Sequence, residues 1–501
     1  MSDKSIIIIG GGIAGLSAGC YGRMNGFRTL IFEMHKKPGG LCTSWKRAGY
    51  TIDGCIHWLV GSSPATSFYR MWEELGAIQG RTMVDFEEYM RFEGANGERF
   101  IVYTDIDRLE GHMKKIAPQD SSVIDEFIKA LRTCTRLDPP WEKAPEVSGL
   151  FDLLKLIVKH FPLLRMLWKW NKVSLQDFGM RFRHPLIRKA FPLLFTPDIS
   201  MPFILMNLAW LHRKSAGYPR GGSLEFSRAI EQRYCSLGGE INYKARVAKI
   251  LTDNGSTVGI RLEDGSEHYA DYVISAADGH ATIFEMLDGK YVDETIHGYY
   301  KNLLPFPSSV HVSLGVNRTF DDIPPLVMGM LFALDETMEV GGVQREFLKV
   351  YMHNFDSSLA PPGKTVMHLF MTTDYDFWTA LRHNPERYAA EKEKIADQVV
   401  AILDKRFPGL AGQVEMRDVA TPTTYVRYTG NWKGSDKGWL VTPATWQYGR
   451  AMQKTLPGLR NFLMAGHWVV PGGGIPTAAM SGRHAIQILC KQEKKKFLTT
   501  V

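Results

Sequence analysis

The sequence predicts an α/β fold in which a parallel sheet is assembled from separate parts of the chain and a second, α+β domain is inserted between them. Two observations near the start support this prediction: an apolar, β-branched strand at 6–9 runs into a glycine-rich turn, and a second apolar strand follows at 27–32. The third comes near the end, where a glycine-rich turn at 471–474 precedes a helix at 477–491. We therefore expect a Rossmann-like nucleotide-binding sheet built by both ends of the chain.

The turn after the first strand has the spacing that dinucleotide-binding folds use. Its G-x-G-x-x-G pattern comprises Gly10, Gly12, Ile13, Ala14 and Gly15. The first glycine permits a tight turn, the second lets the backbone approach a pyrophosphate, and the third lets the helix pack against the strand. The pyrophosphate would lie on the helix N-terminus, whose free N–H groups and dipole favour anions. The second strand ends in Glu33, near the spacing at which a carboxylate binds ribose hydroxyls.

Three more stretches have patterns that suit contacts with a bound nucleotide. Residues 38–58 start with a Pro-Gly-Gly turn and end in a Gly-Cys-Ile-His-Trp run, and 218–223 (Tyr-Pro-Arg-Gly-Gly-Ser) precedes a helix and a strand at 240–251. Near the end, 471–476 reads Pro-Gly-Gly-Gly-Ile-Pro, and Ser-Gly-Arg follows at 481–483. Together with the N-terminal turn, and in the same order, these stretches resemble the phytoene desaturase, carotenoid isomerase and retinol saturase-like family of FAD-dependent oxidoreductases.

The resemblance implies that FAD is the cofactor, and it assigns further residues to the FAD site. These residues are Gly39, Gly40, Val247, Gly466, Gly474 and Ile475. The two glycines of the 38–40 turn would bring backbone amides to phosphate and ribose, and the backbone of Val247 would contact the adenine. The C-terminal loop would close over the far end of the flavin, where amides at a helix N-terminus face the pyrimidine and stabilise the charge of reduced flavin.

The same resemblance implies how the chain divides into domains. We expect the FAD-binding domain at 1–70, 215–290 and 455–501, and the α+β substrate-binding domain at 71–214 and 291–454. The inserted parts are rich in aromatic residues and methionine. A substrate domain of this composition would cover the flavin with an apolar surface.

The segment 150–172 combines apolar and aromatic residues with lysine and arginine, and Asp152 is its only acid. A basic amphipathic helix that carries tryptophan suits the interface of a membrane, and Pro162 should kink or break it. The alternative is a helix that lines the core or a substrate tunnel. Both interpretations stay open at this point.

Composition excludes several other classes. The net charge of +7 is spread along the chain without a nucleic-acid-binding module, so we expect no nucleic-acid partner. The six cysteines are scattered and show no metal-ligand spacing, which predicts a reducing compartment and no metal site. No run of eighteen apolar residues occurs. We expect a cytoplasmic protein, with peripheral contact at the inner face of the membrane as an open alternative.

Two histidines are the catalytic candidates, because they fall in the stretches predicted to meet near the flavin: His57 and His467. A structural role in hydrogen bonding is the alternative for both. No second G-x-G-x-x-G turn exists for a nicotinamide cofactor. Electrons are therefore expected to pass to or from the substrate, a quinone, oxygen or a separate reductase.

The resemblance implies a lipophilic small-molecule substrate whose carbon–carbon double bonds are formed, reduced or isomerised. A polyene such as a carotenoid, terpenoid or retinoid is the first expectation. The alternatives are an unsaturated fatty acid isomerase or reductase, a flavin amine oxidase, and a lipid-binding flavoprotein fold that has lost its chemistry.

Overall fold

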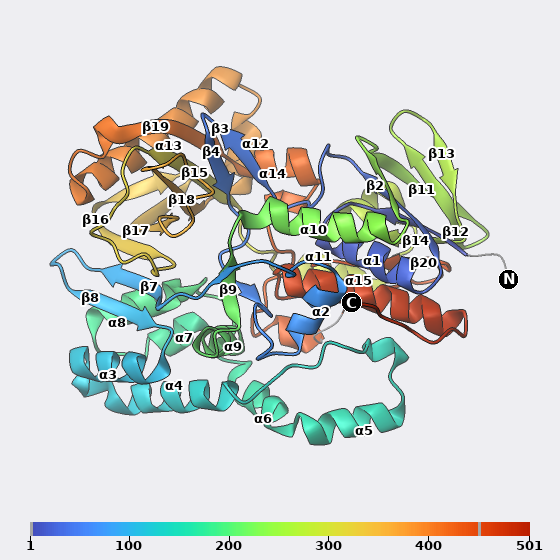
Figure 1. Ribbon diagram of the computed structural model, residues 1–501, viewed down its shortest axis with the longest axis horizontal. Helices are drawn as coiled ribbons and strands as arrows, with labels where there is room; N and C mark the ends of the chain where they lie inside the picture. Colours follow the sequence, from blue (N-terminus) through green and yellow to red (C-terminus); the bar gives the residue numbers. More distant parts are fainter. Residues whose placement is uncertain (1–3, 449–451) are drawn as a thin grey trace.

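The computed structural model describes residues 4–448 and 452–501. Its first layer is a five-stranded sheet in which every strand pair is parallel. In spatial order the strands are β10 (Glu240–Tyr243), β2 (Arg28–Glu33), β1 (Ser5–Ile9), β14 (Tyr272–Ser275) and β20 (Phe462–Met464). Both ends of the chain and its middle thus contribute to one sheet (Figure 1).

Two helices from opposite ends of the sequence pack side by side on this sheet: α1 (Ile13–Met24) and α15 (Ile475–Gln492) (Figure 1). Their backbones approach closely at Gly482, where an added Cβ would lie 2.3 Å from the carbonyl oxygen of Ala14. The helix α10 (Gly222–Ser236) also contacts α1. A residue without a side chain is therefore required where the first and last helices meet.

The second layer is a seven-stranded mixed sheet built from the inserted parts of the chain. In order, its strands are β19 (Val414–Ala420), β15 (Ser309–Val316), β18 (Thr365–Thr372), β17 (Val343–Met352), β16 (Met330–Val340), β7 (Glu88–Glu93) and β8 (Arg99–Tyr103). One face carries apolar residues such as Val312 and Leu348, which pack with Ile395 and Val399 of α13 (Pro385–Arg406). The two sheets confirm the predicted fold class. The domain boundaries that we expect from the resemblance stay a prediction.

The strand predicted at 240–251 is wrong as a single element. The extended backbone is interrupted at Lys244, whose φ of 57° lies in the left-handed region, and β11 (Val247–Asp253) then begins a separate sheet. This three-stranded antiparallel sheet also contains β12 (Ser256–Leu262) and β13 (Glu267–Tyr269). The consequence is that Val247 starts a strand beside the nucleotide-binding sheet instead of continuing one within it.

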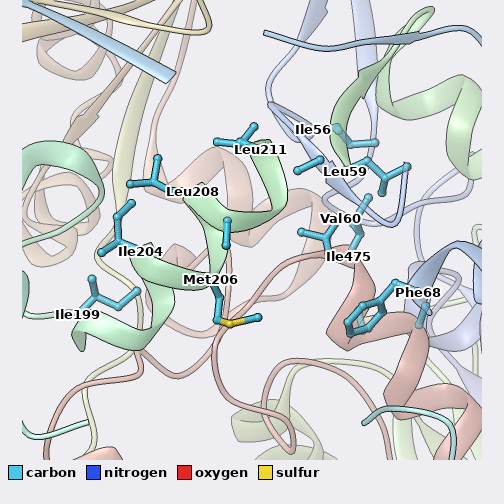
Figure 2. Packing of buried hydrophobic residues seen from close by; sticks show 14 of the residues in the cluster. Ile56, Leu59, Val60, Phe68, Ile199, Ile204, Met206, Leu208, Leu211 and Ile475 are labelled. Atoms are coloured by element: carbon cyan, nitrogen blue, oxygen red, sulfur yellow. The ribbon is translucent and has the colours of Figure 1, made fainter. Parts of the chain in front are cut away.

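Several helices of the inserted part pack together beside the β8 edge of the second sheet (Figure 1). They include α3 (Ile106–Ile116), α4 (Ser121–Cys134), α7 (Leu175–Gly179), α8 (Pro185–Ala190) and α9 (Met201–His212). Figure 2 shows the apolar side chains of α9, with Met206 on the side where Val60, Phe68 and Ile475 lie. Since Ile475 begins α15, α9 joins the core of the inserted part to the C-terminal helix.

The predicted break in the basic segment occurs next to Pro162. Two helices form, α5 (Leu150–Lys159) and α6 (Phe161–Trp170), with the proline in the first turn of α6. They lie at the edge of the molecule (Figure 1). One side of α6 is buried through residues such as Leu163 and Trp170, whereas Trp168 is 81% exposed. Among the described residues, no helix is both long and apolar enough to cross a membrane.

The crossing at Gly482 generates a stability prediction. We expect Gly482→Ala to lower the free energy of unfolding by about 1–3 kcal/mol, because the new methyl group must displace backbone atoms of α1. The control is Gly111→Ala in α3, where an added Cβ meets nothing within 4 Å and helix propensity predicts stabilisation by about 1 kcal/mol. Thermal unfolding followed by circular dichroism measures both, and equal midpoints for the two variants would contradict the close crossing.

Candidate flavin site

A large cavity lies between the two sheets and has a volume of about 2860 Å³. Pockets for drug-sized ligands are typically about 300–1,000 Å³, so this cavity can hold a dinucleotide together with a second long molecule. All but one of the residues predicted to bind the cofactor line it: Gly10, Gly12, Ile13, Ala14, Glu33, Gly39, Gly40, Val247, Gly466, Gly474 and Ile475. The exception is Gly15, which packs against Gly10, where an added Cβ would lie 1.9 Å from the carbonyl oxygen.

The N-terminus of α1 opens into this cavity without a capping side chain. Its N-cap is Gly12, and a Cβ added there would meet no atom closer than 3.9 Å. The first N–H groups of a helix have no partner inside the helix, and the helix dipole adds positive potential at this end. The space in front of Gly12 therefore suits a pyrophosphate.

Glu33 lies at the end of β2 beside this turn. Its carboxylate accepts hydrogen bonds from the backbone N–H groups of Gly11, at 2.6 Å, and His35, at 2.7 Å. Burial raises the pKa of Glu33, whereas these two hydrogen bonds oppose that rise. Each carboxylate oxygen can accept a second hydrogen bond, so Glu33 fits the predicted contact with ribose hydroxyls.

A second uncapped helix N-terminus opens into the same cavity. It belongs to α15, whose N-cap is Gly474, with φ of 86°. The preceding loop is fixed by a hydrogen bond from the Gly466 N–H to the Ser481 hydroxyl, at 2.7 Å. Two helices from opposite ends of the chain thus direct free N–H groups into one cavity. This arrangement fits a ligand with an anionic centre and a distant electron-accepting ring, as FAD has.

The two predicted catalytic histidines also line the cavity. The His57 ring stacks on Tyr351 with ring centroids 4.1 Å apart, and burial lowers its pKa well below the ordinary value. The ring of His467 lies 3.2 Å from the carbonyl oxygen of Gly474, and burial lowers its pKa to about 4. Both imidazoles are therefore neutral near pH 7. His467 is held by the loop that also carries Gly466 and Gly474, which are predicted to bind the flavin.

Sequence reasoning missed a group of histidines on the cavity side of the seven-stranded sheet. His311 of β15 lies 3.0 Å from His368 of β18, and Ser313 is within hydrogen-bonding distance of both. The ring of His353 lies 4.8 Å from that of His368. Burial lowers the pKa of His311 to about 3. A signal was present, because serine and histidine alternate with valine and leucine along 309–314.

With this geometry established, a family assignment follows from sequence comparison. A family model described as flavin containing amine oxidoreductase matches residues 13–489. The chain belongs to this family. Its members are flavoproteins, so the protein is an FAD-dependent oxidoreductase and the predicted cofactor is confirmed. The non-catalytic alternative is thereby set aside.

Individual relatives of this flavoprotein are distant but extend over most of its length. A chloroplastic prolycopene isomerase from Arabidopsis thaliana is 26% identical over 445 residues, which cover 86% of this chain and 73% of that protein. A 4,4'-diapophytoene desaturase from Methylomonas sp. is 23% identical over 528 residues, covering 99% and 97%. The solved structure of a cyclohexylamine oxidase from Brevibacterium oxydans gives a TM-score of 0.60 at 14% identity, covering 98% and 100%. That structural likeness supports the fold.

The free space in front of Gly12 generates a prediction about cofactor binding. We expect Gly12→Ala and Gly12→Val to weaken FAD binding progressively, since their side chains occupy the space for the pyrophosphate while contacting little of the protein. The FAD-free forms should unfold at the same temperature as FAD-free wild type. Absorbance at the flavin band gives the FAD content per chain. Full FAD content in Gly12→Val would contradict the proposed position of the pyrophosphate.

Proposed function

We propose that the enzyme acts on carbon–carbon double bonds of a lipophilic polyene, such as a carotenoid, terpenoid or retinoid, by desaturation, saturation or isomerisation. The observation that carries this proposal is the continuity of the cavity, which runs from the predicted flavin residues to α5 and α6. Apolar and aromatic side chains line much of it, among them Leu163, Leu167, Phe195, Phe203 and Met206. The prolycopene isomerase and diapophytoene desaturase relatives are named for chemistry on such polyenes.

Bound FAD supplies or accepts the two electrons by which a single bond and a double bond differ. The chain itself binds the polyene along apolar walls, orients one bond and excludes water. Desaturation removes two protons with the two electrons, saturation adds them, and isomerisation leaves both counts unchanged. Neutral His57 and His467 line the same cavity and are the proposed groups for proton exchange. We also propose a quinone, oxygen or a separate reductase as the electron partner.

We further propose that the substrate enters from a membrane surface beside α5 and α6. Several large apolar side chains of these helices are exposed to solvent: Phe151, Ile157, Val158, Phe161, Leu164 and Trp168. Lys159 and Arg165 are exposed with them and would favour anionic lipids. Val158 and Lys159 also line the cavity. A peripheral position at the membrane would therefore place the mouth of the cavity next to a lipophilic substrate that is dissolved in the bilayer.

Oxidation of an amine is the second candidate function, since it is the chemistry in the family's description. Aromatic residues that could orient a neutral amine, including Tyr425 and Trp468, line the cavity. The volume and the connection to an apolar surface favour the polyene. An unsaturated fatty acid would use the same features.

The reaction is tested by anaerobic incubation of the oxidised and the reduced holoenzyme with carotenoids, retinoids and polyunsaturated fatty acids. We expect a product that differs by two hydrogens, or an isomer of equal mass and altered retention time, by mass spectrometry and chromatography. Gly12→Val is the matched control and should form no product. If simple amines reduce the flavin rapidly while no lipid reacts, amine oxidation replaces the proposal.

The membrane contact is tested with a double variant that carries both Phe161→Ser and Trp168→Ser. We expect its partitioning onto phosphatidylglycerol-containing vesicles to fall about tenfold or more, because burial of each aromatic side chain contributes about 1.5–3 kcal/mol. Tyr269→Ser is the control, since Tyr269 is 66% exposed on β13 and lies outside both helices. Vesicle flotation measures the bound fraction. Equal vesicle binding by wild type, the double variant and Tyr269→Ser would contradict a membrane contact through α5 and α6.

A further inference from the structure

The cavity-facing side of β17 carries two cations among apolar and aromatic neighbours. Its alternate residues all line the cavity: Val343, Arg345, Phe347, Lys349 and Tyr351. The residues between them include Leu348 and Val350, which are buried in the core on the α13 side. The alternation of a strand therefore points the two cations into the cavity.

The ammonium group of Lys349 has no carboxylate partner among the described residues. Burial is the main cause that lowers its pKa to about 8, and the neighbouring charge of Lys437 contributes to the same shift. Lys437 is itself paired with Asp436. On its own strand, Lys349 lies 5.7 Å from the ring centroid of Tyr351, the ring on which His57 stacks. A positive charge is thus held beside a proposed proton-exchange group with nothing in the described chain to neutralise it.

Arg345 extends the positive potential along the same face of β17. Its guanidinium donates to the carbonyl oxygen of Thr372, and its buried Nε atom has no hydrogen-bond partner in the part of the chain that the structure describes. It likewise forms no ion pair with a carboxylate of the described residues. Burial of an uncompensated charge is costly, and a hydrocarbon substrate would increase that cost by displacing water.

We propose that Lys349 binds a carboxylate of the substrate, so that the substrate is an unsaturated lipid acid and not an uncharged polyene. This inference rests on the proposed function, because it assumes that the cavity holds an unsaturated lipid. A carboxylate at Lys349 forms a charge-assisted hydrogen bond that is shielded from solvent. The apolar chain then extends along the cavity toward α9 and α6. Anchoring one end of a repetitive chain fixes which double bond reaches the flavin.

The test compares two carboxylic acids with their uncharged methyl esters, which keep the same hydrocarbon chain: all-trans-retinoic acid with methyl retinoate, and linoleic acid with methyl linoleate. Each is titrated into the oxidised holoenzyme, and binding is read from the shift of the flavin absorbance band. We expect wild type to prefer the acid in at least one pair. Lys349→Met should weaken binding of that acid about tenfold or more while leaving binding of the ester unchanged.

Two further variants make the result specific. Lys349→Arg keeps the charge and should retain the preference for the acid, and Lys115→Met removes an exposed lysine of α3 and should behave as wild type. Equal affinity for acid and ester in both pairs, or binding of neither acid, would overturn the anion site. If the enzyme converts an uncharged polyene and shows no preference for the acids, the proposed function is supported and the anion site is wrong. Acid preference without any reaction would support the anion site and count against the proposed function.

Discussion

The close crossing of α1 and α15 is the constraint on which the rest of the structure depends. The two helices come from opposite ends of the chain and meet where Gly482 lets one backbone touch the other. This contact places their uncapped N-termini at Gly12 and Gly474, both facing the same cavity. A fixed distance between the two sites lowers the entropy that the protein loses when an elongated cofactor binds both. The long insertion between the helices is tolerated because it folds as a second layer with its own core.

The seven-stranded sheet has an apolar face and a face that carries polar and charged side chains. Toward α13 its strands present a continuous apolar surface, which provides the stability of the inserted part. Toward the cavity the same strands present histidines, serine and tyrosine, such as His311. They also present the two cations Arg345 and Lys349, which form no ion pair with a carboxylate in residues 4–448 and 452–501. Such groups do not increase stability, since burial shifts their protonation and several of their nitrogen atoms have no hydrogen-bond partner among the described residues. We infer that these groups serve to bind the substrate.

The sequence predicted the flavin end of the site better than the substrate end. Glycines at fixed spacing and Glu33 are local requirements of a turn and a helix start, so they can be recognised without knowing the tertiary structure. The cavity residues of β15 and β17 follow only an alternating pattern, which identifies a strand but does not say what faces it. The break at Lys244 was missed for a related reason, because a left-handed lysine leaves no compositional signal. His57 and His467 reach the cavity as expected, and their catalytic roles stay a prediction.

The most direct test of this account is the flavin content of the purified chain, combined with the effect of added FAD on its thermal unfolding. One cavity with two fixed helix N-termini predicts one FAD per chain, released into solution by acid, and a rise of the unfolding midpoint with FAD concentration. A chain that stays colourless in excess FAD, with an unchanged midpoint, would contradict the assignment of this cavity to the cofactor.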